Sequence, residues 1–258
     1  MSELIVSIEE ICTAAGAVLM KHYGNLEHID MKGEVNLVTV ADRESEALIK
    51  RMINERYPGH QVLGEETGED YAGRGEEYRW VVDPLDGTTN FAHSFPAFCV
   101  SIGVERRGET VAAGIFAPYY GEMFLAERGA GARLNGKPLR VSRVGTLAES
   151  LVVTGFPYYV RDRLDITLEW WRRFLGNTHG MLRMGAAALD MCAVASGRLE
   201  VFWQEGLLPW DTAAGLLVVE EAGGRVTDFA GGKFSPYGKQ VLASNGLVHD
   251  ECVALLAE

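Results

Sequence analysis

Four extended segments follow one another between residues 98 and 141 and are separated only by short turns. In order they are FCVSIGVE, TVAAGIFAP, EMFLAE and ARLNGKPLRV. The last contains Asn135-Gly136, the strongest short-range signal for a β-hairpin. Antiparallel neighbours can be joined by a tight turn, whereas parallel neighbours need a long crossover. The four segments therefore predict a large antiparallel or mixed sheet.

The rest of the chain alternates between helical and extended patterns. An amphipathic helix is predicted over residues 1–24, and a second follows the extended piece at 36–42. Residues 66–78 are acidic and contain glycine, which favours an exposed loop. Further strands are predicted at 61–66, 79–83, 151–156, 199–203 and 240–245, and further helices at 161–175, 187–197, 210–224 and the C-terminus. Helices should therefore cover a large, mostly antiparallel sheet and a second, smaller one.

Composition limits the classes of protein to consider. The chain has 258 residues, 47% of them hydrophobic, enough for one domain made of two lobes, roughly 1–145 and 146–258. The net charge of −12 argues against nucleic acid and anionic membranes as partners, which call for a basic face. The four cysteines are scattered among apolar neighbours, and no run is long and uncharged enough to span a bilayer. We expect reduced thiols in a cytoplasmic protein.

Two carboxylates end the strand in VVDPLDGTTNF, residues 81–91. Pro84 fixes the backbone so that Asp86 can return toward Asp83, and Gly87 permits a turn that a side chain would oppose. The following TTN resembles a helix start, whose free N–H groups can hold an anion. Carboxylates for cations beside donors for an anion predict a phosphate-plus-magnesium site. The alternative is an Asp-rich turn capped by Asp86.

Two further acidic residues favour the metal site. Glu65 follows a short strand and a glycine in LGEET, and Asp211 stands at a helix start in PWDTAAG, where its ordinary role is an N-cap. The chain has no G-x-x-x-x-G-K-[ST] phosphate loop and no G-x-S-x-G elbow, and its six histidines are isolated. Carboxylates are thus the remaining candidates for chemistry.

These motifs together resemble the inositol monophosphatase family of magnesium-dependent, lithium-sensitive phosphatases. NLVTVAD, GEE, WVVDPLDGTTNF, FPAFCVSIG, GAAALDMCAVASGRLEVFW and WDTAAGLLVVEEAGG occur in the family's order, almost end to end. The resemblance implies an α+β fold, an αβαβα layered sandwich with a large mostly antiparallel sheet and a smaller one. It also implies a homodimer.

The resemblance assigns two to three Mg²⁺ ions to the site. Glu65, Asp83 and the backbone carbonyl of Leu85 would hold one, while Asp83, Asp86 and Asp211 would hold a second. Glu65 would also reach a third, weaker ion. Cations neutralise the repulsion that these carboxylates would otherwise suffer, which explains why the chain gathers them.

Residues for the attacking water and the phosphate follow from the same resemblance. Asp42 and Thr88 match the pair that positions the water, with Glu65 assisting, although Asp42 equally suits a helix cap. N–H groups of Gly87 and Thr88 would donate to the phosphate.

The resemblance also assigns residues to the side of the site that binds the sugar alcohol. This side would be lined by Gly185, Ala186 and Ala187, beside Asp86 and Asp211, although small residues equally suit close helix packing. Family members that bind inositol hydroxyls commonly carry a Glu seven residues before the W-D aspartate. Here Gln204 stands at that place, followed by Glu205.

We predict a phosphomonoesterase that acts on a small-molecule phosphate monoester, and the favoured substrate is myo-inositol 1-phosphate. Histidinol phosphate, fructose 1,6-bisphosphate and 3′(2′),5′-bisphosphonucleosides are the alternatives, because enzymes for them share the same metal residues. A hypothesis of another class is a regulatory protein that binds the transcription machinery. Arg172 and Arg173 in WWRRF are the basic residues that would test it, although a helix with two core aromatics and a solvated basic edge is equally consistent.

Overall fold

The computed structural model describes residues 2–25, 29–32, 36–70, 77–157 and 159–257. Its helices are α1 (Glu3–His22), α2 (Val40–Arg56), α3 (Thr88–Ala92), α4 (Leu164–Asn177), α5 (Ala187–Ala195), α6 (Pro209–Glu221) and α7 (His249–Leu256). Its strands are β1 (Ile29–Lys32), β2 (Asn36–Thr39), β3 (Gln61–Gly64), β4 (Gly68–Asp70), β5 (Tyr78–Asp86), β6 (Cys99–Arg106), β7 (Glu109–Ala117), β8 (Glu122–Glu127), β9 (Gly131–Leu134), β10 (Lys137–Pro138), β11 (Leu151–Thr154), β12 (Gly180–Leu182), β13 (Val201–Glu205), β14 (Arg225–Thr227) and β15 (Gln240–Ser244).

The larger sheet has the strand order β10-β9-β8-β7-β6-β5-β3-β4. Its neighbours are antiparallel except for the parallel pair of β3 and β5. The predicted hairpin is confirmed, because Asn135 and Gly136 connect β9 to β10 with φ values of 48° and 77°. Both central residues of a type I′ turn need such positive φ values, which Asn and Gly adopt at low cost. The large, mostly antiparallel sheet is thus confirmed.

The smaller sheet has the order β12-β11-β13-β15-β14, and β1 pairs with β2 in a separate hairpin. β11 is parallel to both of its neighbours, whereas β15 is antiparallel to both β13 and β14. A parallel neighbour requires a crossover, which helices supply here: α4 connects β11 to β12, and α5 connects β12 to β13.

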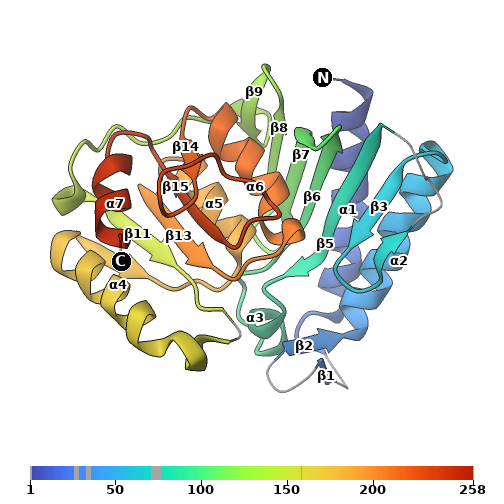
Figure 1. Cartoon of the computed structure of the whole chain (residues 1–258). Helices are drawn as coiled ribbons and strands as arrows, with labels where there is room; N and C mark the ends of the chain where they lie inside the picture. The colour runs from blue at the N-terminus through green and yellow to red at the C-terminus, as the bar shows by residue number, and fades with distance from the viewer. Residues whose placement is uncertain (1, 26–28, 33–35, 71–76, 158, 258) are drawn as a thin grey trace.

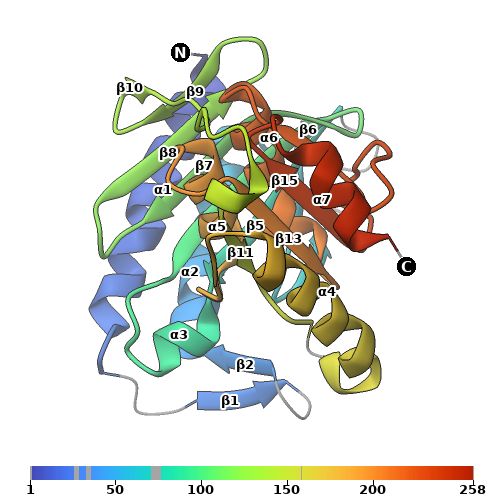
Figure 2. The ribbon, with the colours of Figure 1, turned by 90° about the vertical axis from the view of Figure 1, so that its left-hand side faces the viewer.

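Five layers follow from how the helices cover the sheets (Figures 1 and 2). α1 and α2 pack on the outer face of the larger sheet, and α5 and α6 lie between the two sheets. α4 and α7 cover the outer face of the smaller sheet. This is the αβαβα sandwich that the sequence predicts.

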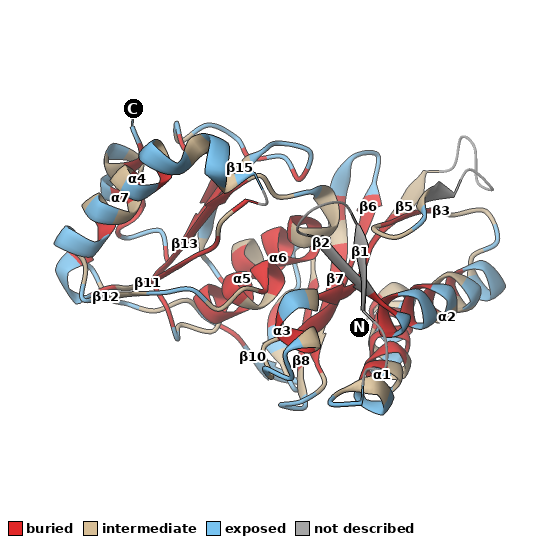
Figure 3. Cartoon of the chain, turned by 90° about the horizontal axis from the view of Figure 1, so that it is seen from below, coloured by how far each residue is buried: buried red, intermediate tan, exposed pale blue. Residues whose placement is uncertain are grey.

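The core follows the same layers. One buried cluster lies between the larger sheet and α1 and α2, and another joins both sheets through α5 and α6. A third cluster, which includes Trp170, Phe174 and Trp203, lies under α4 and α7. Figure 3 shows that α5 and α6 are buried along most of their length, whereas α4 and α7 expose their outer sides. Because the middle cluster takes residues from both sheets, the two sheets share one continuous core.

The structure differs from the predicted pattern mainly in short elements. The exposed loop predicted at 66–78 is partly wrong, since β4 pairs with β3 there and β5 already begins at Tyr78; residues 71–76 lie outside the described residues. Strands of three residues such as β4, β12 and β14 are too short to show a period-two pattern. In the described residues no helix is long and apolar enough to cross a membrane, and all four cysteines are buried free thiols.

Candidate active site

One cavity of about 180 Å³ collects the carboxylates that the sequence predicts to bind metal. Glu65 enters it from the residue after β3, Asp83 and Asp86 from the end of β5, and Asp211 from the first turn of α6. The parallel pairing of β3 with β5 brings two of these segments together, because their carboxyl ends lie at the same edge of the sheet. α6 then packs against β5 and β6 and adds the fourth carboxylate.

A bulge in β5 turns both aspartates to the same side. Asp83 pairs with Ser101 of β6 and Asp86 pairs with Cys99, so a step of three residues along β5 matches a step of two along β6. Residues two apart on a strand share a face, and the inserted residue gives Asp83 and Asp86 that relation despite their spacing. The backbone N–H of Leu85 donates to Asp83 Oδ1 at 3.0 Å and stabilises the bulge.

Gly87 is required where β5 gives way to α3. Its φ is +90°, in the left-handed region, and an added Cβ would lie 2.7 Å from the carbonyl oxygen of Ala97. Any other residue would therefore suffer both backbone strain and a steric clash. The predicted helix start is confirmed, because α3 begins at Thr88. α3 has only five residues, so its dipole is small.

Asp42 caps α2 with one carboxylate oxygen and lies beside Thr88 with the other. Its Oδ2 accepts hydrogen bonds from the backbone N–H of Thr39 at 2.8 Å and from Thr39 Oγ1 at 2.6 Å, which caps α2. Its Oδ1 lies 3.3 Å from Thr88 Oγ1, which also lies 3.0 Å from the carbonyl oxygen of Leu85. Because a hydroxyl has one proton, Thr88 donates to one of these acceptors at a time.

Asp86 and Asp211 are each held by a backbone N–H. Asp86 Oδ2 accepts from Ala188 in the first turn of α5 at 2.7 Å. Asp211 Oδ2 accepts from Leu208 at 2.7 Å, so Asp211 caps α6 from its third position. The N-cap role considered from sequence is therefore wrong in position, since Leu208 is the N-cap residue. One oxygen of each carboxylate is fixed by the fold.

Burial and mutual repulsion raise the pKa values of the carboxylates in this cavity. Burial raises the pKa of Asp83 well above its usual value, and the charges of Glu65, Asp86 and Asp211 raise it further. Burial also raises the pKa of Asp86 to about 7, against the lowering effect of the Ala188 N–H. Burial and the charge of Asp86 raise the pKa of Asp211 to about 7. Such a cluster is stabilised by positive charge placed among its oxygens.

The donor set fits a hard divalent cation. Carboxylate and carbonyl oxygens, with no sulfur among the predicted ligands, are what Mg²⁺ prefers. As the side chains stand in the described ranges, no three His, Cys, Asp or Glu residues are grouped closely enough to hold a metal ion. The cavity thus gathers oxygen donors of the kind that a hard divalent cation prefers.

The predicted sugar side of the site is only partly assembled around the cavity. Gly185 and Ala187 line it, whereas Ala186 is buried and lies behind Gly87. Gln204 lines the cavity, and its amide oxygen lies so near Gly155 that an added Cβ there would be only 2.0 Å away. The absence of a side chain at Gly155 therefore leaves room for the Gln204 amide.

Glu205 lies on the opposite face of β13 from Gln204. It lines a separate surface groove and accepts a hydrogen bond from Arg163 Nε at 3.2 Å. Neighbouring residues on a strand point to opposite faces, so Gln204 and Glu205 cannot both face the cavity without a break in β13.

Sequence reasoning missed one charged residue of the cavity. Arg183 is the basic side chain among the described residues that line it. It precedes Gly185 by two residues and is exposed. A basic residue beside a predicted phosphate site was the available signal, but nothing local distinguishes Arg183 from other surface arginines.

Comparison with known proteins agrees with this geometry. Residues 1–258 match the model of the inositol monophosphatase family. The inositol-1-monophosphatase of Synechocystis sp. is 40% identical over 250 residues, which cover 96% of this chain and 86% of that protein. The Nus factor SuhB of Pseudomonas aeruginosa is 44% identical over 223 residues, or 84% of this chain and 82% of that protein.

A solved structure gives the same result for the fold. The crystal structure of the extragenic suppressor protein suhB from Bartonella henselae superposes with a TM-score of 0.95 at 37% identity, covering 100% of this chain and 99% of that one. With matches this long at this identity, the chain belongs to the inositol monophosphatase family.

Proposed function

We propose that this protein is a magnesium-dependent phosphomonoesterase, and that its preferred substrate is myo-inositol 1-phosphate. The observation that carries the proposal is the gathering of four carboxylates around one cavity. Members of the family are generally metal-dependent phosphatases, which agrees with that donor set.

Each predicted ligand has a place in this proposal. Glu65, Asp83 and the carbonyl oxygen of Leu85 would hold one Mg²⁺, while Asp83, Asp86 and Asp211 would hold a second. Glu65 would also reach a third, weaker ion, and competition by lithium for a weakly held ion would make the enzyme sensitive to lithium. When bound, the cations lower the pKa of a water and neutralise charge on the phosphate oxygens.

The remaining residues orient the reactants. Asp42 Oδ1 accepts a hydrogen bond from Thr88 Oγ1, so the lone pairs of Oγ1 can accept a hydrogen bond from the attacking water, with Glu65 as the assisting carboxylate. Backbone N–H groups of Gly87 and Thr88, which both line the cavity, donate to phosphate oxygens. Because α3 is short, these donors act directly and not through a helix dipole.

We place the leaving alcohol against Gly185 and Ala187, with the amide of Gln204 hydrogen-bonded to its hydroxyls. Small side chains leave room for a ring at this side of the cavity. An amide offers one acceptor and two donors, so it binds hydroxyl groups without demanding one arrangement of them. We therefore propose that several sugar and polyol phosphates are accepted. Histidinol phosphate, fructose 1,6-bisphosphate and bisphosphonucleosides remain the alternative substrates.

A phosphate-release panel across these substrates, with Mg²⁺ and with excess chelator, tests the proposal. We expect turnover of inositol 1-phosphate that stops in chelator and falls in millimolar lithium. Robust turnover in chelator would contradict the metal assignment. Faster turnover of histidinol phosphate or a bisphosphate would keep the mechanism and change the substrate.

We also propose that the chain forms a homodimer in the cytoplasm. A mostly apolar notch of about 290 Å³ at the start of α5 and the end of β7 is a surface on which a second copy can pack. Its lining includes Tyr120, Leu182, Met184 and Leu189. Light scattering on the purified protein tests this, and a mass of one chain at micromolar concentration would contradict it.

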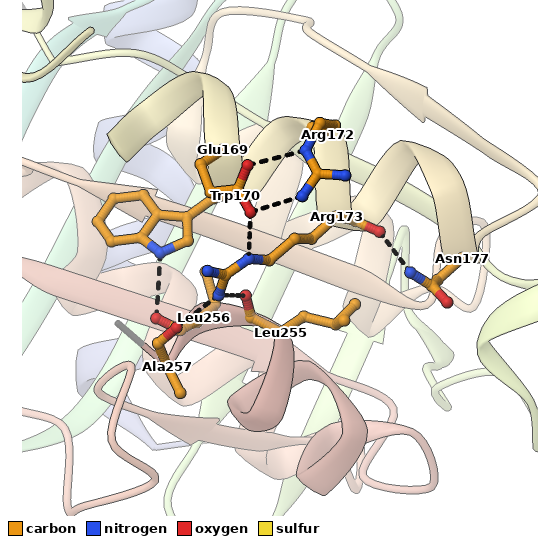
Figure 4. Close-up of polar contacts among 8 residues, drawn as sticks. All are labelled: Glu169, Trp170, Arg172, Arg173, Asn177, Leu255, Leu256 and Ala257. Carbon is orange, nitrogen blue, oxygen red and sulfur yellow. Dashed lines mark hydrogen bonds and ion pairs between the residues drawn. The ribbon is translucent and has the colours of Figure 1, made fainter. Parts of the chain in front are cut away.

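A regulatory role is the second candidate, favoured by the name of the Pseudomonas relative, a Nus factor. Arg172 and Arg173 of α4 are the residues that would test it, and the structure gives them different partners (Figure 4). Arg173 donates to the carbonyl oxygens of Leu255 and Ala257, so it holds the C-terminal end of α7. The expected solvated edge is correct only for Arg172, whose side chain is 73% exposed. Loss of partner capture in a pull-down on Arg172→Glu alone is therefore the cleaner test.

A further inference from the structure

Helix α2 presents a buried polar face to the loops that carry the carboxylates. Asp42, Ser45 and Glu46 are spaced i, i+3 and i+4, and none of the three is more than 1% exposed. Residues at this spacing lie on one face of a helix. Burying polar side chains is unfavourable unless they find partners, so the partners of this face indicate what it does.

Each residue of the face contacts a different segment of the proposed metal site. Asp42 lies beside Thr88 of α3, and Ser45 Oγ donates to the carbonyl oxygen of Pro84 at 3.0 Å, inside the β5 bulge. Glu46 contacts the turn after β3, which carries Glu65.

Glu46 accepts several hydrogen bonds with its buried carboxylate. Its Oε2 accepts from the backbone N–H of Glu66 at 2.8 Å, and its Oε1 accepts from Thr67 Oγ1. Lys50 Nζ, one helical turn on, lies 3.4 Å from the same Oε1 and also contacts Thr67. The charge is therefore both paired and hydrogen-bonded, which is the condition for tolerating it inside a protein.

These contacts fix the backbone of Glu65 on both sides. The N–H of Glu65 donates to the carbonyl oxygen of Val82 at 3.2 Å, and the next N–H, of Glu66, donates to Glu46. Val82 directly precedes Asp83, so the first bond ties Glu65 to the strand that carries the other carboxylates. The second bond ties it to α2. With both peptide units held, the direction in which the Cα–Cβ bond of Glu65 points is set.

Gly64 leaves room for the Glu46 carboxylate. A Cβ built on Gly64 would lie 2.7 Å from the Glu46 carboxyl carbon and 2.8 Å from both oxygens, closer than real contacts allow. The φ of Gly64 is not in the left-handed region, so its backbone would accept alanine. The absence of a side chain at this position thus serves the approach of Glu46 and not the turn itself.

We propose that Glu46 is a positioning residue for metal binding, which acts by aiming Glu65 at the cavity. This inference rests on the proposed function, because it assumes that Glu65 is a ligand. Groups hydrogen-bonded to the metal ligands themselves commonly affect metal affinity by about 10-fold to 100-fold when they are removed. Glu46 holds the residue next to Glu65, so we expect an effect at the lower end of this range.

The experiment titrates Mg²⁺ alone into the purified protein at constant temperature and follows binding by calorimetry. We expect Glu46→Ala to raise the Mg²⁺ midpoint, which is the Mg²⁺ concentration at half saturation, by about tenfold. Glu46→Gln should raise it by less than about threefold, because its amide oxygen still accepts from Glu66. Glu55→Ala, an exposed residue of the same helix, is the matched control and should leave the midpoint unchanged.

A merely structural role gives a different result. It would lower the melting temperature in chelator while leaving the Mg²⁺ midpoint of Glu46→Ala equal to that of the wild type, and this outcome overturns the inference. If the wild type itself binds no Mg²⁺, the proposed function fails instead, so the two failures are distinguishable. The kinetic counterpart is a loss of activity in Glu46→Ala that higher Mg²⁺ restores.

Gly64→Ala supplies a second variant should Glu46→Ala fold poorly. In an otherwise wild-type chain the added methyl group displaces the Glu46 carboxylate, so the Mg²⁺ midpoint should rise about as much as in Glu46→Ala. In the Glu46→Ala background the clash is gone, and adding Gly64→Ala should change the midpoint little. Such non-additivity is the signature of two residues acting through one contact. Additive effects of the two substitutions would contradict the proposed coupling.

Discussion

Thr88 and Asp42 stand 46 positions apart in the chain, yet Thr88 Oγ1 lies 3.3 Å from Asp42 Oδ1. Thr88 begins α3 at the end of the bulged strand, and Asp42 lies in the first turn of α2. The other oxygen of Asp42 is occupied by Thr39, so the carboxylate has one fixed side and one side turned to Thr88. This geometry suits a pair that orients a water.

We predict that Asp42→Asn and Thr88→Ala lower kcat by about tenfold or more while KM for the substrate changes little. Groups that orient an attacking water act mainly in the transition state, so their loss appears in kcat. Steady-state kinetics at saturating Mg²⁺ measure this, with the exposed Thr13→Ala as a control for loss of a hydroxyl. A rise in KM alone would make the two residues binding groups.

Asp86→Asn should abolish activity and shrink the rise in melting temperature that Mg²⁺ causes. Mg²⁺ stabilises the folded state by RT ln(1 + [Mg²⁺]/Kd), and the substitution raises Kd because it removes one charged ligand. The backbone N–H of Ala188 can still donate to the side-chain amide oxygen of this variant, so the fold should survive. Circular dichroism checks the fold, and an undiminished Mg²⁺ effect would exclude Asp86 as a ligand.

Gln204→Glu should sharpen the preference for inositol 1-phosphate over glycerol 2-phosphate by about fivefold to tenfold in kcat/KM, because a carboxylate accepts charge-assisted hydrogen bonds from ring hydroxyls. Such bonds are about twice as strong as neutral ones. Glu205→Gln should leave the ratio unchanged, because Glu205 faces Arg163 in the groove behind β13. A change with Glu205→Gln alone would reverse these assignments.

Gly155→Ala tests the role of Gln204 in another way, by displacing its side chain. Its methyl group would meet the Gln204 amide oxygen, so the amide must turn away from the substrate. The variant should thus weaken polyol preference without altering the Mg²⁺ dependence.

The contribution of His249 to stability should fall by on the order of 1 to 2 kcal/mol between about pH 7 and about pH 5. Burial lowers the pKa of His249 from 6.5 to about 4, and its ring nitrogens lie 2.8 Å from Thr227 Oγ1 and from Ser244 Oγ. The folded state therefore disfavours the proton on His249, and this contribution to stability is complete above pH 6.5 and is lost as the pH falls toward 4. The raised pKa values of Asp86 and Asp211 act in the opposite direction, so urea unfolding at both pH values must compare the wild type with a His249 variant.

His249→Gln is the comparison that isolates this contribution. It lacks the titrating ring, so the difference in free energy of unfolding between wild type and variant should shrink as the pH falls from about 7 to about 5. A difference that stays constant with pH would show that His249 does not titrate in this range.

Arg173→Met should destabilise the protein by about 1 kcal/mol, whereas Arg172→Met should change stability by less than about 0.5 kcal/mol. Arg173 holds the end of α7 through backbone carbonyl oxygens, and Trp170 Nε1 donates to Leu256 beside it at 3.1 Å (Figure 4). Arg172 forms an ion pair only with Glu169 of its own helix among the described residues. Equal effects in urea unfolding would contradict this difference.

The sequence by itself determined the family, the large sheet and the identity of the four carboxylates. These features are local: the DPLDGTTNF run contains its own bulge, left-handed glycine and helix start, and Asn135-Gly136 specifies its own turn. Period-two and helical patterns also located most long elements within a few residues. Strands of three residues escaped because they are shorter than the pattern that would reveal them.

Only the tertiary structure decided which polar residues support the site. Nothing near Glu46 in the sequence indicates that its carboxylate accepts from Glu66, and the spacing of Arg172 and Arg173 does not reveal which one binds α7. Strand alternation places Gln204 and Glu205 on opposite faces, but which face meets the cavity depends on where α5 and α6 pack. The physical reason is that such contacts join distant segments, so they exist only once the layers have assembled.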